Sequence, residues 1–407
     1  MDIFEQSESR VRFYSELFPT VFKKSKGTFL FDVADNCYID FFCAAGSLNY
    51  GHNNNILKDK LINYIKNDGI TNSLDMKTTA KAKFLNIFDR VILSKRKLKY
   101  KIQFPGPTGT NSIEAALKLA RKITGYKNII YFKNSFHGMT LGSLSVSFNP
   151  KKRKSAGIPL NYCVEFPFSN QLYCTVSKIE KYIKHAKNTS NYPAAIILET
   201  IQAEGGVNIA NIEWLKEIEY ISNKNNIILI IDDIQVGCGR TGNFFSFEKA
   251  GIYPDIVCLS KSLSGYGLPF SVVLIKPEFD IWEPHEHNGT FRGNNFAFVT
   301  ATEAISHYWS DTKLADTIYN NSLFLKDKLY SLKKINKRLI IRGYGLIWGI
   351  DVLNKDYANK IQSESFKQGL LIESCGINNS VLKIMPPLTI KQDILNNGIE
   401  IIKKSLQ

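Results

Sequence analysis

The chain has 407 residues, of which 44% are hydrophobic and 22% are charged, and its formal net charge is +15. This composition excludes a disordered chain, a collagen-like repeat and a small disulfide scaffold, and the length predicts several domains or one large α/β unit. No apolar stretch approaches the roughly 20 residues that span a bilayer, which excludes an integral membrane protein.

The positive charge does not favour nucleic-acid binding. Lysines make up 42 of the 52 basic residues, and the basic runs that begin at Lys95 and Lys151 are short and show no obvious stacking pattern of neighbouring aromatic residues. A solvated surface is the simpler interpretation, and steep salt dependence of DNA binding would revive the alternative. The first residues carry acids where a secretory signal carries bases, so we expect a cytoplasmic protein without nucleic-acid or membrane partners.

The cysteines and histidines show no metal-binding pattern. Seven cysteines form no CxxC pair, and their number is odd. Six histidines contain no HExxH motif. We therefore expect neither a disulfide framework nor a metal site.

The opening segment, residues 1–50, predicts one helix and two strands. Apolar residues between positions 4 and 18 favour a short amphipathic helix that Pro19 ends. The runs GTFLFD from Gly27 and CYIDFF from Cys37 favour strands joined by a polar turn at residues 34–36. We expect this segment to pack with a small domain at the other end of the sequence.

Residues 51–296 alternate between helical patterns and apolar, β-rich runs. Buried strands are predicted at residues 128–132, 194–198, 227–231 and 255–259. Such alternation predicts a large α/β domain with a mostly parallel sheet and helices on both faces.

Residues 297–407 predict a smaller α+β domain. A long helical pattern runs from 297 to 332, and the strand-like runs RLIIRGYG and LIWGIDV follow. A helix near residues 356–368, a strand at 381–384 and a final helix complete the expected order.

The segment IILIIDDIQVGCGRTG, from Ile227, is an apolar strand that ends in Asp232 and Asp233. In open α/β sheets, ligands bind beyond the carboxyl ends of the strands. A carboxylate buried there needs a cation or a hydrogen-bond donor. An ordinary strand end can also carry two acids, so the motif alone leaves catalytic and structural roles open.

The segment DIVCLSKSLSGYGLP, from Asp255, places Lys261 between two serines at the end of another apolar strand. Burial lowers the pKa of a lysine and makes its amine a better nucleophile. Lys261 is therefore a candidate for Schiff-base chemistry, with a surface lysine after a strand as the alternative.

The segment FPGPTGTNSIEAALKLAR, from Phe104, is a Gly/Thr-rich turn that leads into a helix, with Thr110 or Asn111 as its cap and Gly125 at its end. Free backbone N–H groups at such a helix start suit a phosphate. A phosphate turn, a strand-end acid and a strand-end lysine in one α/β domain match pyridoxal 5′-phosphate chemistry.

These segments, in this order, resemble class III aminotransferases, which have fold type I of the pyridoxal phosphate-dependent transferases. The motifs SLNYGHNN, DDIQVGCGRTG, LSKSLSGYGLP and HNGTFRGNNFAFVTA are similar to those of the diaminobutyrate–2-oxoglutarate aminotransferases, as is ESRVRFYSELFPTVF near the start. The resemblance covers nearly the whole chain. It implies a homodimer or higher homo-oligomer with shared active sites.

The resemblance also implies roles for the strand-end residues. Lys261 occupies the position of the lysine that holds the cofactor, and it is also the general base and acid. Asp232 occupies the position of the acid that faces the pyridine nitrogen. Gln235 matches the residue that hydrogen-bonds the phenolic oxygen of the cofactor. Asp233 stands where many relatives have glutamate.

Further cofactor-binding positions follow from the same resemblance. Gly109 and Thr110 fall on the phosphate turn. Phe136, in SFHGMT, matches the aromatic residue that stacks on the pyridine ring, and His137 follows it. Thr290 matches a residue lent across the dimer interface to the phosphate of the neighbouring site.

Four residues are candidates for binding the substrate. Glu199, in LETIQAEGG, matches an active-site glutamate of the family. Lys383 replaces the arginine with which many relatives bind the α-carboxylate, and a lysine cannot form the bidentate fork. Arg240 and Arg292 are further candidates for this carboxylate, and a structural role is the alternative for Arg240.

The resemblance implies that L-glutamate donates its amino group and leaves as 2-oxoglutarate. L-aspartate 4-semialdehyde would accept the amine at C4 and give L-2,4-diaminobutyrate. One alternative is another class III ω-aminotransferase, acting on ornithine, 4-aminobutyrate or a diamine. A second is a catalytically idle aminotransferase fold that serves as a binding subunit, against which the presence of Lys261, Asp232 and Gln235 argues.

Overall fold

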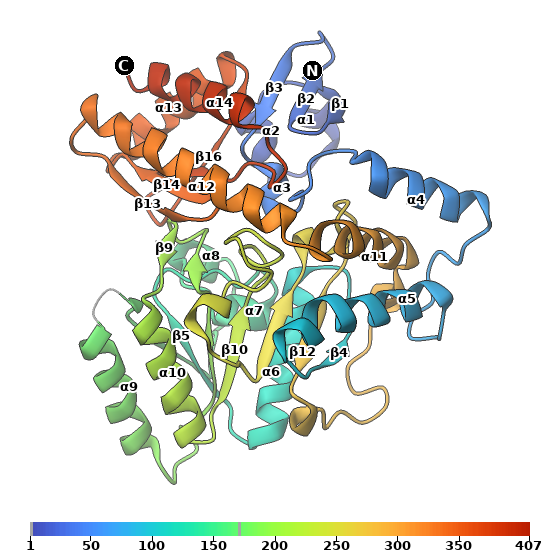
Figure 1. Cartoon of the computed structure of the whole chain (residues 1–407). Helices are drawn as coiled ribbons and strands as arrows, with labels where there is room; N and C mark the ends of the chain where they lie inside the picture. The colour runs from blue at the N-terminus through green and yellow to red at the C-terminus, as the bar shows by residue number, and fades with distance from the viewer. Residues whose placement is uncertain (1–2, 170–171) are drawn as a thin grey trace.

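The structure is a computed structural model that describes residues 3–169 and 172–407. Figure 1 shows a large sheet flanked by helices, with the C-terminal elements and the first strands gathered at one end of it. The large sheet has the strand order β4-β12-β11-β10-β7-β5-β6. Its bounds are β4 Lys101–Gln103, β5 Asn128–Phe132, β6 Cys163–Phe166, β7 Pro193–Leu198, β10 Ile228–Asp232, β11 Ile256–Leu259 and β12 Val272–Ile275.

The large sheet is mostly parallel, as the sequence predicts. Strands β6, β5, β7, β10 and β11 run parallel to their neighbours, whereas β12 and β4 pair antiparallel at one edge. The four strands expected between residues 128 and 259 are all present. Their residues are buried on both faces, which explains their near-continuous apolar sequences.

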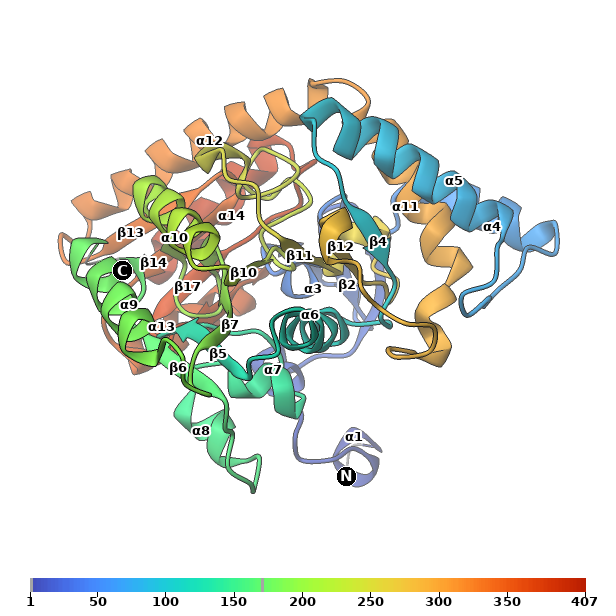
Figure 2. The ribbon, with the colours of Figure 1, turned by 90° about the horizontal axis from the view of Figure 1, so that it is seen from below.

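Helices cover both faces of this sheet (Figure 2). On one face α6 packs, where Ile113 meets Ile129 and Ile197. On the other face the Trp214 ring lies 4.9 Å from that of Phe132. The helices of this part of the chain are α4 Asn55–Lys66, α5 Thr79–Ile87, α6 Gly109–Thr124, α7 Leu141–Ser145, α8 Pro150–Lys154, α9 Leu172–Ala186, α10 Ile212–Lys224 and α11 Asn295–Trp309.

The first strands pair with a strand from the last third of the chain. The sheet order is β1-β2-β3-β15, with β15 parallel to β3. The two expected strands are β2 and β3, which form an antiparallel pair. The expected division at residues 50 and 296 stays a prediction. The bounds are β1 Phe22–Lys26, β2 Phe29–Asp32, β3 Cys37–Asp40 and β15 Leu370–Leu371, followed after β3 by the turn α3 Cys43–Gly46.

The single helix expected before Pro19 is wrong. The structure has two short helices instead, α1 Ile3–Ser7 and α2 Tyr14–Leu17. Between them Val11 is 89% exposed and Phe13 is also exposed. Because both side chains are largely exposed, no buried face stabilises a helix across this stretch.

The C-terminal sheet is antiparallel, in the order β13-β14-β17-β16. The long helix expected up to residue 332 is divided into α11 and α12, and at the break Asp311 Oδ1 accepts a hydrogen bond from Lys313 N at 3.1 Å, in the first turn of α12. No helix in the described parts of the chain is long and apolar enough to cross a membrane. The bounds are α12 Lys313–Ser331, β13 Ile340–Tyr344, β14 Ile347–Asp351, α13 Lys355–Lys367, β16 Glu373–Cys375, β17 Val381–Ile384 and α14 Gln392–Ser405.

Candidate active site

The predicted acid and the predicted lysine meet at the same edge of the large sheet. Strand β10 ends at Asp232, and the adjacent parallel strand β11 is followed by Ser260 and Lys261. A cavity of about 160 Å³ lies there. It brings together eight of the predicted site residues. The lining residues are Gly109, Thr110, Phe136, His137, Gly138, Glu199, Ile201, Glu204, Asp232, Ile234, Gln235, Val236 and Lys261.

Lys261 has an unusual backbone conformation. Its φ is 47°, in the left-handed region that non-glycine residues rarely adopt, and such strain concentrates at functional sites. The next residue holds the turn in place, because Ser262 Oγ donates to Gly46 O at 2.6 Å and accepts from Asn49 N at 3.1 Å. Burial lowers the pKa of the Lys261 amine, although Glu204 acts in the opposite direction. The lowered pKa favours the neutral, nucleophilic amine.

Asp232 is held from two sides. Its Oδ2 lies 2.7 Å from His137 Nδ1, and its Oδ1 accepts a hydrogen bond from Ile234 N at 3.1 Å. The backbone N of His137 donates in turn to Ser147 Oγ at 2.8 Å. These bonds fix the orientation of a buried carboxylate at the cavity wall.

The start of α6 forms another wall of the cavity. The helix begins at Gly109 and its cap is Thr108, so the predicted caps, Thr110 or Asn111, are two or three residues too late. Thr108 N donates to Asn111 Oδ1 at 3.1 Å. The backbone N–H groups of Gly109 and Thr110, in the first turn, have no partner within the helix and lie at its positive end. A Cβ on Gly109 would lie 3.0 Å from Ile234, so glycine keeps this wall open.

Glu199 supports the backbone of Phe136. Its Oε1 accepts a hydrogen bond from Phe136 N at 2.9 Å. Burial and the nearby Asp232 raise the pKa of Glu199 well above its usual value. The same two causes favour the protonated form of this cavity-lining acid.

Glu204 is a cavity residue that the sequence analysis missed. Its Oε1 accepts a hydrogen bond from Gln235 Nε2 at 3.0 Å and lies 2.5 Å from Lys383 Nζ. Lys383 itself is fully buried and reaches the cavity through this contact. Burial raises the pKa of Glu204, but Lys383 and Lys261 outweigh it and lower the pKa to about 2. The sequence did offer a signal for Glu204, because it is the second acid of the motif LETIQAEGG in which Glu199 was singled out.

Arg240 and Thr290 lie outside this cavity. Arg240 is fully buried and donates to Leu346 O at 3.1 Å, to Pro386 O and to Asn49 Oδ1. Its guanidinium thus joins three distant segments, which favours the structural alternative.

Thr290 is exposed at the start of a short 3₁₀ turn, and its role at a neighbouring site stays a prediction. Arg292 pairs with Asp75 at 2.9 Å, away from the cavity. Asp233 points away from the cavity, since its Oδ2 accepts a hydrogen bond from Ser246 N at 3.1 Å.

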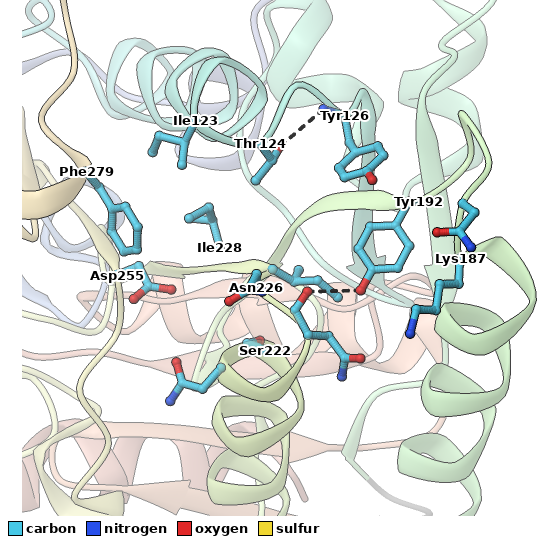
Figure 3. A pocket seen from close by; sticks show the side chains of 14 residues that line it. Ile123, Thr124, Tyr126, Lys187, Tyr192, Ser222, Asn226, Ile228, Asp255 and Phe279 are labelled. Atoms are coloured by element: carbon cyan, nitrogen blue, oxygen red, sulfur yellow. Dashed lines mark hydrogen bonds between the residues drawn. The ribbon is translucent and has the colours of Figure 1, made fainter.

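A separate cavity of about 430 Å³ lies at the amino-terminal ends of the parallel strands, opposite the ends that carry Asp232 and Lys261 (Figure 3). It is lined by residues that precede or begin strands, among them Tyr192, Ile228 and Asp255. Tyr192 donates there to Asn225 O at 2.9 Å. None of the predicted site residues lines this second cavity, so the candidate active site lies at the carboxyl ends of the strands.

A family model described as Aminotransferase class-III matches residues 12–406. The chain belongs to the class III aminotransferase family. Two bacterial relatives are both named diaminobutyrate–2-oxoglutarate transaminase. The one from Halalkalibacterium halodurans is 52% identical and the one from Oceanobacillus iheyensis 50% identical, each over all of this chain and 96% of its own length.

Solved structures confirm the expected fold of this class III aminotransferase. A transaminase from the marine bacterium Virgibacillus has a TM-score of 0.89 at 20% identity, covering 99% of this chain and 97% of its own. The ornithine aminotransferase of Toxoplasma gondii has a TM-score of 0.85 at 25% identity, covering 99% and 93%. That structure is described with pyridoxal phosphate at partial occupancy in its active site.

Class III aminotransferases use pyridoxal 5′-phosphate, and the residues of this cavity fit the cofactor. The N-terminus of α6 offers unpaired N–H groups to a phosphate, Lys261 offers an amine to the aldehyde, and Asp232 offers a carboxylate to a protonated ring nitrogen. His137 Nε2 is buried without a hydrogen-bond partner among the described residues. A buried polar atom of this kind is typical of a functional site rather than of a packed core.

Proposed function

We propose that this class III aminotransferase moves the amino group of L-glutamate to C4 of L-aspartate 4-semialdehyde, giving 2-oxoglutarate and L-2,4-diaminobutyrate. The observation that carries the proposal is the full-length similarity, at about 50% identity, to relatives named for this reaction. The grouping of Lys261, Asp232 and Gln235 around one cavity supports an active enzyme rather than an idle fold.

Pyridoxal phosphate, when bound, supplies an electron sink for the negative charge that forms on the substrate carbon. Gly109 and Thr110 would hold its phosphate, and Phe136 would stack on its ring. Asp232 would keep a proton on the ring nitrogen, and His137 fixes the orientation of that carboxylate. The residues that hold the cofactor are thus proposed from the positions they take around the cavity.

Lys261 has two proposed tasks. Its amine would hold the aldehyde of the cofactor and, once free, would remove a proton from the substrate carbon and return it. Such general acid–base catalysis typically contributes about 10²–10⁴ in rate. The lowered pKa of Lys261 supports both tasks, because both need the neutral amine.

Lys383 is the proposed partner for the α-carboxylate of glutamate. In the structure Lys383 already forms an ion pair with Glu204, with 2.5 Å between Nζ and Oε1. A substrate carboxylate can pair with Lys383 only after Glu204 has withdrawn. In the half-reaction of diaminobutyrate the reacting amine is remote from the carboxylate, so Glu204 can stay. Glu199, at the cavity wall, is the second residue that would contact the substrate, and its raised pKa weakens repulsion of the substrate carboxylates.

We further infer a homodimer, or a higher homo-oligomer built from dimers. Thr290 and Phe291 are exposed, with Phe291 at 66%, and Thr290 matches a residue that the family lends to the neighbouring subunit. Light scattering coupled to size-exclusion chromatography would measure the mass, and a monomer that is fully active would contradict the shared site. Localisation in the cytoplasm stays a prediction.

Product identification tests the proposed reaction. The purified enzyme, loaded with pyridoxal phosphate, would be incubated with L-glutamate and L-aspartate 4-semialdehyde. We expect 2-oxoglutarate and L-2,4-diaminobutyrate in equal amounts by chromatography and mass spectrometry. Absence of diaminobutyrate together with turnover of ornithine or 4-aminobutyrate would show that the enzyme is a class III aminotransferase with a different amine substrate. Absence of all turnover in folded, loaded protein would favour the idle fold.

A further inference from the structure

Lys383 has a second carboxylate partner. Glu373 Oε1 lies 2.8 Å from Lys383 Nζ, on the neighbouring strand. In the antiparallel pair of β16 and β17, Glu373 stands directly opposite Lys383, so the two side chains share one face of the sheet. Glu204 approaches the same amine from the loop that follows β8 Ile201–Gln202. One cation is therefore shared by two acids.

The two acids differ in how they are placed. The Glu204 side chain is 28% exposed and lines the cavity. Glu373 is 3% exposed, is fixed by its strand, and does not line the cavity. The phenol of Tyr14, from α2, is a further neighbour that interacts with Glu373. Glu204 can therefore withdraw toward the cavity, whereas Glu373 stays beside Lys383.

This difference matters for the donor half-reaction, and the argument rests on the function proposed above. We propose that Glu373 is a positioning residue that weakens the attraction of Lys383 for the α-carboxylate of glutamate. When Glu204 withdraws, the carboxylate of Glu373 remains next to the lysine. The incoming carboxylate then meets a cation whose charge is already partly compensated.

The consequence is a balance between the two half-reactions. A bare buried lysine would hold glutamate tightly and would release 2-oxoglutarate slowly, since both carry the same carboxylates. Diaminobutyrate reacts through its terminal amine, which leaves the Glu204–Lys383 pair closed. The charge of Glu373 therefore lowers the affinity for glutamate and 2-oxoglutarate and hardly changes the affinity for diaminobutyrate.

The charge state of Glu373 supports this role. Burial raises the pKa of Glu373 to about 7, although Lys383 acts against the rise. The other ionisable groups that interact with Glu373 among the described residues are Glu204, Lys261, Tyr14 and the thiol of Cys375. A substantial fraction of Glu373 therefore carries its charge when assayed at pH 8.

Glu373→Gln is the direct test, because it removes the charge at nearly constant volume. Single-turnover rates would be measured by the visible absorbance of the loaded enzyme, at pH 8, across concentrations of glutamate and of diaminobutyrate. We expect the apparent dissociation constant for glutamate to fall about tenfold, the order set by one partly screened charge a few ångströms away. The constant for diaminobutyrate should stay within about twofold, as should both maximal rates.

Two matched variants separate charge from structure. Glu373→Asp keeps the carboxylate and should keep the weaker, wild-type affinity for glutamate. Glu364→Gln removes a glutamate from a surface ion pair with Lys367 and should change neither constant. A rise of the glutamate constant in Glu373→Gln, or an equal shift of both constants, would overturn the proposal. Failure of the proposed function is distinguishable, because the wild-type enzyme would then not respond to these two amines.

A binding measurement provides a readout that does not depend on turnover. Glutarate has the two carboxylates of glutamate and no amine, so it cannot react. We expect glutarate to raise the melting temperature of Glu373→Gln more than that of the wild type, each compared with its own ligand-free melt. A smaller or equal shift in the variant would contradict the role of Glu373, and the ligand-free melts report whether the variant folds.

Discussion

His137 Nδ1 lies 2.7 Å from Asp232 Oδ2, and both side chains are buried. The histidine is one residue beyond Phe136, in the segment after β5, whereas Asp232 ends β10. Two strands of the parallel sheet thus deliver an aromatic ring, an imidazole and a carboxylate to one cavity. The contact fixes the carboxylate that would face the ring nitrogen of the cofactor.

Removing the imidazole should therefore weaken catalysis without removing the acid. We expect His137→Phe to slow both half-reactions by roughly tenfold, since a hydrogen bond to a charged group is worth about 1.5–3 kcal/mol and only part of it acts on the rate. Stopped-flow absorbance would measure the rates. In the Asp232→Asn background the same change should have a much smaller effect, because the two residues act as a unit. Fully additive losses would show that they act independently.

Asp232→Asn should keep the cofactor bound and slow both half-reactions by about 10²-fold or more, because the neutral amide no longer favours a protonated ring nitrogen. Retention of the cofactor after gel filtration separates this loss from a binding defect. Undiminished rates would remove Asp232 from the proposed role.

Lys261→Ala should abolish turnover and covalent attachment of the cofactor. Borohydride reduction followed by peptide mass spectrometry would find the cofactor on Lys261 in the wild type and on no residue of the variant. Turnover near the wild-type rate would refute the assignment of this lysine.

Asp233 should make stability depend on pH. Burial raises the pKa of Asp233 to about 7 from 3.8, and one oxygen has no donor among the described residues. In the folded state the acid keeps its proton up to about pH 7, whereas the unfolded chain loses it near pH 4. The free energy of unfolding therefore falls as pH rises from about 4 to 7 and is flat above.

The contribution of Asp233 is on the order of 4 kcal/mol. Asp233→Asn should reduce the difference in melting temperature between pH 5 and pH 8, leaving a residual slope from groups such as Glu373, whose pKa is also raised. Asp35→Asn, at an exposed turn, is the matched control. An unchanged difference in Asp233→Asn would mean that this acid is ionised in the folded protein.

The sequence was sufficient for the parts of the site that depend on strand ends. Asp232 and Lys261 follow apolar strands of a parallel sheet, and parallel strands end at one edge, so their meeting could be predicted. Strand ends give no such guidance for Arg240, for which the sequence left substrate binding and a structural role open. Its side chain is used to join segments far apart in sequence, and such contacts leave no local pattern.

The network around Lys383 lay beyond sequence reasoning for a related reason. Glu373 and Lys383 are ten positions apart and meet only because β16 and β17 pair in a particular register. Glu204 was within a motif already singled out, but nothing local distinguishes its orientation from that of Glu199. The prediction of one N-terminal helix was wrong for a different reason: the local pattern was present, but a helical pattern without a packing partner does not secure a helix.

The most direct test of the account is a half-reaction screen on the loaded wild-type enzyme. Diaminobutyrate, glutamate, ornithine and 4-aminobutyrate would be added separately while the visible absorbance of the Lys261-bound cofactor is recorded. The account predicts loss of this band with diaminobutyrate and glutamate and its persistence with the other two. A band that persists with diaminobutyrate and disappears with ornithine or 4-aminobutyrate would contradict the proposed reaction.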